Sequence, residues 1–168
     1  MRLIFAVLLL VLAQPTWAVE ISNFRSGLAC TNSGSKTAKS GWICQPTEDV
    51  LVTDQGSCVY DGKTQSCTWV GFEFDYANAG ADAKLQCLQE SSAPTAFGNP
   101  EEVISQSVRS QDFEIPLKGD SGHFFNPQYF IFMTTQGGRS DLVVRGTCRS
   151  GSTVVFRYRF NVRFPSAS

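Results

Sequence analysis

The stretch that decides the fold lies near the C-terminal end, where residues 142–164 read LVVRGTCRSGSTVVFRYRFNVRF. Its second half alternates strictly. One face carries Phe156, Tyr158, Phe160, Val162 and Phe164, and the other carries Arg157, Arg159, Asn161 and Arg163. A period of two is typical of a β-strand that packs one face on a core and turns the other to water. Residues 142–149 alternate in the same way, which predicts an antiparallel hairpin.

The length of the turn decides which side chains face each other in this hairpin. A three-residue loop, Ser150–Ser152, places Cys148 opposite Val154, so that the apolar faces of the two strands coincide. We therefore expect this loop. The same register sets Arg145 opposite Arg157, and like charges directly across two strands are unfavourable.

Strand patterns recur upstream, separated by clusters of Gly, Asn, Asp, Ser and Pro. Residues 70–76 alternate, and Tyr129–Met133 is apolar on both faces, as expected of a central strand. Further strands are expected at 50–53, 84–89 and 113–117, where Pro116 requires a sheet edge or a strand end. At most one short helix is expected, near 100–110. The pattern predicts an all-β, single, disulfide-stapled antiparallel β-sandwich, with a partly open β-barrel as the alternative.

The N-terminal residues have the three parts of a secretory signal: Arg2, an apolar run from Leu3 to Leu12, and a small residue, Ala18. We expect cleavage after Ala18, with cleavage after Ala13 as the weaker alternative. Cleavage after Ala18 leaves 19–168 as one β-rich domain without a membrane span. The apolar run is too short to cross a bilayer. The predicted location is secreted or periplasmic. Since no asparagine lies in a permissive glycosylation site, bacterial export is favoured.

The six cysteines remain after that cleavage, and an even number in an exported chain predicts disulfides. Their wide spacing does not suit zinc. A turn on Gly62-Lys63 would make Cys58 and Cys67 direct neighbours and predicts a Cys58–Cys67 bridge, whereas an Asp61-Gly62 turn would break it. The remaining predicted pairs are Cys30–Cys44 and Cys87–Cys148.

No catalytic constellation is predicted. The segment Gly119-Asp120-Ser121-Gly122 resembles the residues around the nucleophile of chymotrypsin-like proteases. That mechanism needs a histidine base, which lies upstream of the serine in those enzymes, whereas the sole histidine here, His123, follows it. We interpret the segment as a turn and His123 as a loop residue. No metal site and no cofactor are expected.

Trp69, Glu73 and Asp75 fall on one face of a predicted strand. An exposed indole beside carboxylates can stack on a sugar ring, and paired carboxylates can cleave a glycosidic bond. This predicts an alternative function, a glycan-binding or glycan-cleaving sandwich. Packing of Trp69 into a second layer is the simpler interpretation.

Charge is unevenly distributed along the chain. Residues 139–163 carry six arginines and one acid, whereas residues 19–138 carry seven bases and fourteen acids. The candidate binding residues are the arginines of the predicted outer strand face: Arg145, Arg149, Arg157, Arg159 and Arg163. Arginine suits bidentate binding of carboxylate or phosphate.

Three functions remain open at this level. The leading hypothesis is a non-enzymatic interaction module that binds a protein or an anionic envelope polymer through the arginines; the others are the glycan module and a structural subunit of a surface assembly. Because the domain is slightly acidic overall, no nucleic acid partner is expected.

Overall fold

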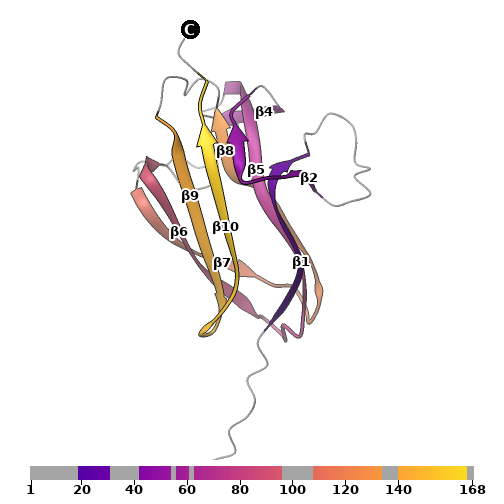
Figure 1. Ribbon diagram of the computed structural model, residues 1–168. Coiled ribbons are helices and arrows are strands. Elements are labelled where there is room, and N and C mark those ends of the chain that lie inside the picture. Colours follow the sequence, from indigo (N-terminus) through magenta and orange to yellow (C-terminus); the bar gives the residue numbers. More distant parts are fainter. Residues whose placement is uncertain are drawn as a thin grey trace, which may run out of the picture.

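The computed structural model describes residues 19–30, 42–53, 56–60, 63–95, 108–133 and 140–165. They form ten strands in two sheets (Figure 1). The first sheet, called sheet A, contains β1 (Glu20–Ala29), β2 (Ile43–Pro46), β4 (Gly56–Tyr60), β5 (Lys63–Ala77) and β8 (Gly122–Met133). The second, sheet B, contains β3 (Asp49–Leu51), β10 (Thr153–Arg163), β9 (Leu142–Ser150), β6 (Lys84–Thr95) and β7 (Val108–Pro116). All strand pairs are antiparallel except β3 with β10.

The two sheets pack face to face around an aromatic core, which confirms the predicted β-sandwich. From sheet A, Phe72 and Phe74 of β5 are completely buried. From sheet B, Phe156 and Tyr158 of β10 meet them, with ring centroids 5.4 Å apart for Phe72 and Phe156 and 5.0 Å for Phe72 and Tyr158. These are the apolar positions of the alternating runs, so a period of two correctly marked the core face.

The longest strand, β5, forms the centre of sheet A. Along one edge it pairs with β4 and then with β1, and along the other edge with β8. Among the described strands β8 has no second partner, so the predicted central position of Tyr129–Met133 was wrong. Because β4 and β1 share one edge of β5, β8 takes the other edge and becomes the last described strand on that side of the sheet.

The turn between β9 and β10, drawn in orange and yellow in Figure 1, is shorter than predicted. Ser150 pairs with Thr153, so two residues, not three, lie between the strands. A β-bulge at Val155 then adds one residue to β10 and brings Phe156 opposite Cys148. The apolar faces coincide as expected, but the bulge accomplishes this rather than the loop.

Two of the predicted disulfides are present, Cys30–Cys44 and Cys87–Cys148. The predicted Cys58–Cys67 bridge is wrong, because Cys58 pairs with Gln65 in the backbone register and Cys67 is a free, buried cysteine. Tyr60 pairs with Lys63, which leaves Asp61-Gly62 between the strands. This is the register that the alternative Asp61-Gly62 turn predicted.

The helix expected near 100–110 is wrong at its C-terminal end, since Val108–Ser110 belong to β7. Residues 100–107, like the expected signal segment, lie outside the described residues. The strand β7 is an edge strand that ends at Pro116, as the proline predicted. In the described ranges, no helix has the length and apolar character needed to cross a bilayer.

Candidate functional site

A buried carboxylate lies on the outer face of sheet A, the face turned away from the core. Glu73 of β5 pairs with Arg25 of β1 on one side and with Phe125 of β8 on the other. The side chain of Glu73 is only 2% exposed. Acidic residues are seldom this buried unless they are paired. We therefore expect specific partners around the Glu73 carboxylate.

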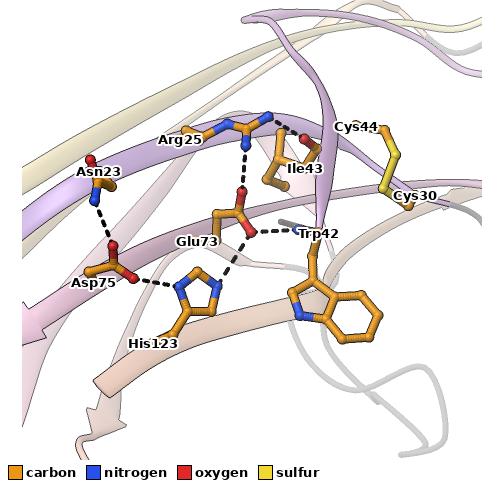
Figure 2. Close-up of polar contacts among 9 residues, drawn as sticks. All are labelled: Asn23, Arg25, Cys30, Trp42, Ile43, Cys44, Glu73, Asp75 and His123. Atoms are coloured by element: carbon orange, nitrogen blue, oxygen red, sulfur yellow. Dashed lines mark hydrogen bonds and ion pairs between the residues drawn. A yellow bond between two sulfur atoms is a disulfide. The ribbon is translucent and has the colours of Figure 1, made fainter. Parts of the chain in front are cut away.

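Three groups hold the Glu73 carboxylate (Figure 2). Its Oε1 lies 3.2 Å from Arg25 Nη1, and its Oε2 accepts a hydrogen bond of 2.6 Å from the backbone N–H of Trp42. His123 Nε2 lies 3.5 Å from the same Oε2. Arg25 also donates to the carbonyl of Ile43 at 2.6 Å, so Glu73 and Arg25 together fix the start of β2 against β1 and β5.

The second carboxylate of this cluster, Asp75, is 42% exposed at its side chain. Asn23 Nδ2 donates to Asp75 Oδ2 at 2.6 Å, and His123 Nδ1 lies 2.7 Å from Asp75 Oδ1. These contacts lower the pKa of Asp75, the hydrogen bond from Asn23 most and that from His123 next. Asn23 reaches Asp75 from a bulge in β1, with a φ of 50° that asparagine tolerates better than most residues.

Trp42 forms the end of the cluster, beside the first disulfide. Its carbonyl accepts the N–H of Cys30 at 2.9 Å, and the Cys30–Cys44 bridge closes the same segment. Its indole stacks on Phe125 with ring centroids 5.0 Å apart and planes inclined by 6°. Trp42 nevertheless remains 48% exposed. A large aromatic ring is therefore stacked on a neighbouring ring while much of its surface faces water.

The predicted glycan residues Trp69, Glu73 and Asp75 do lie on one strand, but they do not form an open patch. Trp69 is half-buried, and its indole N–H donates to the Sγ of Cys67 at 3.0 Å. Glu73 is covered and fully engaged, so its carboxylate is not placed to exchange a proton with a bound ligand. Of the three, only Asp75 presents a well-exposed polar group.

Sequence reasoning missed Arg25, Trp42 and His123 as members of this cluster. His123 is the second residue of β8 and contacts two carboxylates; it is not a loop residue. The nearby Gly119–Gly122 segment contains the expected bends, and Asp120 joins it to the β5–β6 connection by accepting the N–H groups of Ala79 and Gly80.

The predicted arginines share the outer face of sheet B, on β9 and β10, and all are exposed: Arg145, Arg149, Arg157, Arg159 and Arg163. We call this surface the arginine face. The bulge changes its register, because Arg145 pairs with Arg159 and not with Arg157, which pairs with Thr147. The predicted pair of Arg145 with Arg157 is therefore wrong, but an arginine pair, Arg145 with Arg159, occurs across the same two strands.

The arginine face is only partly neutralised by its surroundings. Arg159 Nε donates to Asn161 Oδ1 at 2.9 Å, and Asn161 Nδ2 donates to Asp49 Oδ1 at 3.1 Å. Glu90 of β6 is the register neighbour of Arg145. Among the described residues, no carboxylate lies within ion-pair distance of any arginine of this face.

No group of three or more His, Cys, Asp or Glu side chains in the described ranges is arranged to hold a metal ion. The Glu73 cluster contributes two carboxylates and one imidazole, but Arg25 directly contacts one carboxylate. A guanidinium in that position opposes a cation, so the cluster is organised around hydrogen bonds and ion pairs.

Comparison with known proteins adds little to this description. No protein-family profile matches the sequence, and no curated protein matches it significantly. Among solved structures, the chain is similar to the crystal structure of an immunoglobulin-like protein from Pseudomonas aeruginosa, with 15% sequence identity and a TM-score of 0.44, over 89% of this chain and 100% of that chain. A likeness at this level does not define the function.

Proposed function

We propose that this protein is a non-enzymatic binding module of an extracytoplasmic compartment, and that its arginine face binds an anionic polymer of the cell envelope. One observation carries the proposal: Arg145 and Arg159 are exposed and directly opposite each other on β9 and β10. Like charges in that position destabilise a sheet. An anionic ligand that bridges them would offset the cost.

The chemistry of the side chains favours phosphate or carboxylate groups. A guanidinium offers a planar pair of donors to such anions and keeps its charge at any physiological pH. Arg157 and Arg159 are two residues apart on one strand, which spaces their Cα atoms by about 6–7 Å. A row of repeated charges matches a polymer whose anionic groups also repeat.

A polymer fits this surface better than an acidic protein does. Protein interfaces bury an apolar centre within a polar rim. The exposed large apolar side chains on described strands of sheet B, Leu51, Leu88 and Val108, lie on three strands, β3, β6 and β7. Leu51 pairs with Arg163 and Leu88 pairs with Thr147, so these two side chains border the arginine face on opposite sides of the β9–β10 hairpin and do not form an apolar centre within it.

The compartment follows from two features. The two disulfides are typical of an oxidising environment outside the cytoplasm. The predicted cleavage after Ala18 adds a route of export to the periplasm or beyond it, and the absence of a permissive glycosylation site favours a bacterial source. Mass spectrometry of the exported protein tests this part, because a mature chain that begins at Val19 is expected.

The binding proposal is tested with two probes, poly-glutamate and a linear polyphosphate, each titrated into the purified, oxidised protein at low and physiological salt. The informative variant is Arg145→Gln/Arg159→Gln. Its matched control is Lys63→Gln/Lys118→Gln, which removes the same charge at exposed positions away from the arginine face. Thermal unfolding verifies that both variants are folded.

We expect at least one probe to bind, with affinity that falls steeply with salt. The arginine variant should bind at least tenfold more weakly than the lysine control. An equal loss of affinity in the two variants would show that binding arises from diffuse charge attraction, and this result would overturn the proposal. Failure of both probes, together with capture of a folded acidic protein, would replace the polymer with a protein partner.

A further inference from the structure

We propose that Trp42, His123 and Asp75 form a binding site for a neutral oligosaccharide on the outer face of sheet A. We call it the sugar site. It stands apart from the arginine face, because the two surfaces belong to different sheets and face away from the shared core. Its evidence and its test are therefore independent of the proposed function.

The Trp42 ring is exposed and at the same time packed against its surroundings. Trp42 is fixed at its backbone by Glu73 and Cys30 and at its indole by Phe125, yet it is 48% exposed. An exposed tryptophan without such contacts would sample several rotamers and lose that freedom on binding a ligand. Here the backbone hydrogen bonds and the Phe125 stacking contact restrict that freedom before a ligand binds, which is the preorganisation that favours binding of a small ligand.

A row of polar groups runs from the Trp42 backbone to exposed side chains on the same face of sheet A. Trp42 and His123 both contact Glu73 Oε2, and His123 continues to Asp75, as Figure 2 shows. The side chains of His123 and Asp75 are 44% and 42% exposed. An ionised carboxylate has about four acceptor positions, and the two internal contacts of Asp75 leave others for hydroxyl groups. The same cluster thus carries a flat apolar ring and oxygens that can accept from hydroxyl groups.

Glu73 is buried, whereas its partner Arg25 is half-buried. Removing a carboxylate from water is costly, so an ion pair of this kind is a poor device for stability alone. What this one does is position neighbours, because the single carboxylate holds the Trp42 backbone, the Arg25 side chain and the His123 ring. Glu73 and Arg25 are therefore positioning residues beneath the sugar site.

The class of ligand follows from these features. The C–H face of a pyranose ring stacks on an indole, and hydroxyl groups at the ring edge donate to Asp75. A sugar acid would bring a second negative charge to Asp75, so a neutral sugar is favoured. A protein partner fits less well, because Trp42 is the exposed large apolar side chain on sheet A among the described residues, and a protein interface would need a wider apolar patch.

The test uses cellohexaose and chitohexaose, which are neutral chains of β-linked glucose and N-acetylglucosamine. The oxidised protein is prepared with Trp69→Phe, so that Trp42 dominates the fluorescence of the folded domain. We expect one of the two sugars to change this fluorescence saturably at low millimolar concentration. Isothermal titration of the unmodified protein should give the same affinity.

The variants distinguish a site from a coincidence. Trp42→Ala should abolish sugar binding, and Asp75→Ala should weaken it more than tenfold, while Arg145→Gln/Arg159→Gln should leave it unchanged. Since Trp42→Ala could disturb β2, its cooperative unfolding is compared with that of the parent, and Trp42→Tyr should restore part of the affinity. Unchanged binding by a folded Trp42→Ala variant overturns the proposal, as does the absence of a saturable signal with both sugars.

Discussion

Gly146 lies in the core of sheet B directly opposite Tyr158, and the packing of the C-terminal hairpin depends on its lack of a side chain. A Cβ atom at this position would overlap the ring of Tyr158. The ring cannot easily move aside, because Tyr158 Oη donates to the buried Gln89 Oε1 at 2.8 Å. We therefore expect Gly146→Ala to lower the free energy of unfolding by about 1–3 kcal/mol.

Chemical denaturation of the single and double variants measures this effect. In Gly146→Ala/Tyr158→Leu the overlap is relieved, so the cost of the double variant should be clearly smaller than the sum of the two single costs. Additive costs would show that Gly146 is needed for a reason other than the Tyr158 ring.

Asp75 makes the stability of the fold depend on pH. Its pKa is lowered from an ordinary value of 3.8 in the folded protein, so the folded state binds the proton less tightly than the unfolded chain does. The stabilisation from its contacts with Asn23 and His123 is therefore present above that value and is lost as the pH falls through the lowered pKa. We expect Asp75→Asn to unfold more easily than the wild type at neutral pH.

The difference between wild type and Asp75→Asn should begin to shrink when the pH falls below about 4, where the unfolded chain takes up the proton first, and should disappear once the pH is below the lowered pKa of the folded state. Thermal unfolding across this range provides the measurement. A difference that stays constant down to strongly acidic pH would contradict the assigned role of Asp75.

At this scale the sequence predicted on which face of a strand a residue lies. It did not predict which residues of other strands contact that residue. Alternation placed Glu73 and Asp75 on one face of β5 correctly. It gave no sign that Arg25, Trp42 and His123, which belong to three other segments, would converge on those carboxylates. Only the pairing of β1 and β8 with opposite edges of β5 creates that proximity, and strand order is not encoded in local alternation.

At the scale of elements, the bulge in β10 is the device that keeps the C-terminal hairpin in register. Val155 is the extra residue, and the pairs on its two sides are Val154 with Arg149 and Phe156 with Cys148. Deletion of Val155 would leave those pairs intact. We expect the deletion variant to fold, with a loss of stability of about 1 kcal/mol from the half-buried valine.

Deletion of Arg157 is the matched control, since it removes one residue from the same strand beyond the bulge. It would turn Tyr158 and Phe160 outward and bring the arginines inward, because a slip of one residue exchanges the two faces. Circular dichroism and solubility should show a folded Val155 deletion and an unfolded Arg157 deletion. A folded, soluble Arg157 deletion would contradict the described register.

The strands themselves were largely predictable, because apolar alternation directly reflects burial on one face. Their connections were not. A three-residue loop and a two-residue turn followed by a bulge both align the apolar faces of β9 and β10, so the pattern cannot choose between them. Similarly, Gly62-Lys63 and Asp61-Gly62 are both acceptable turn sequences, and the choice of turn determined the environment of Cys67.

At the scale of the whole molecule, each described disulfide joins neighbouring segments within one sheet. Cys30–Cys44 lies between β1 and β2 in sheet A, and Cys87–Cys148 joins paired positions of β6 and β9 in sheet B. Their sequence separations are 14 and 61 residues. The chain-entropy argument gives stabilisations of about 3 and about 4 kcal/mol respectively.

Two double variants test this ranking. Cys87→Ala/Cys148→Ala should lower the melting temperature more than Cys30→Ala/Cys44→Ala does. The second variant should instead weaken oligosaccharide binding more, because its disulfide lies beside Trp42. Scanning calorimetry and the fluorescence titration give the two results, and a reversed order in either measurement would contradict the corresponding role.

The placement of the bridges also determines how the protein would respond to a pulling force. A load applied between the N-terminal and C-terminal ends passes through both disulfide bonds and bypasses the 14 and 61 residues of sequence separation that they span. The oxidised chain would therefore extend roughly 250 Å less than the reduced chain, at about 3.3–3.6 Å per residue. If the protein links an envelope polymer to another surface, its redox state sets the maximum length of that tether.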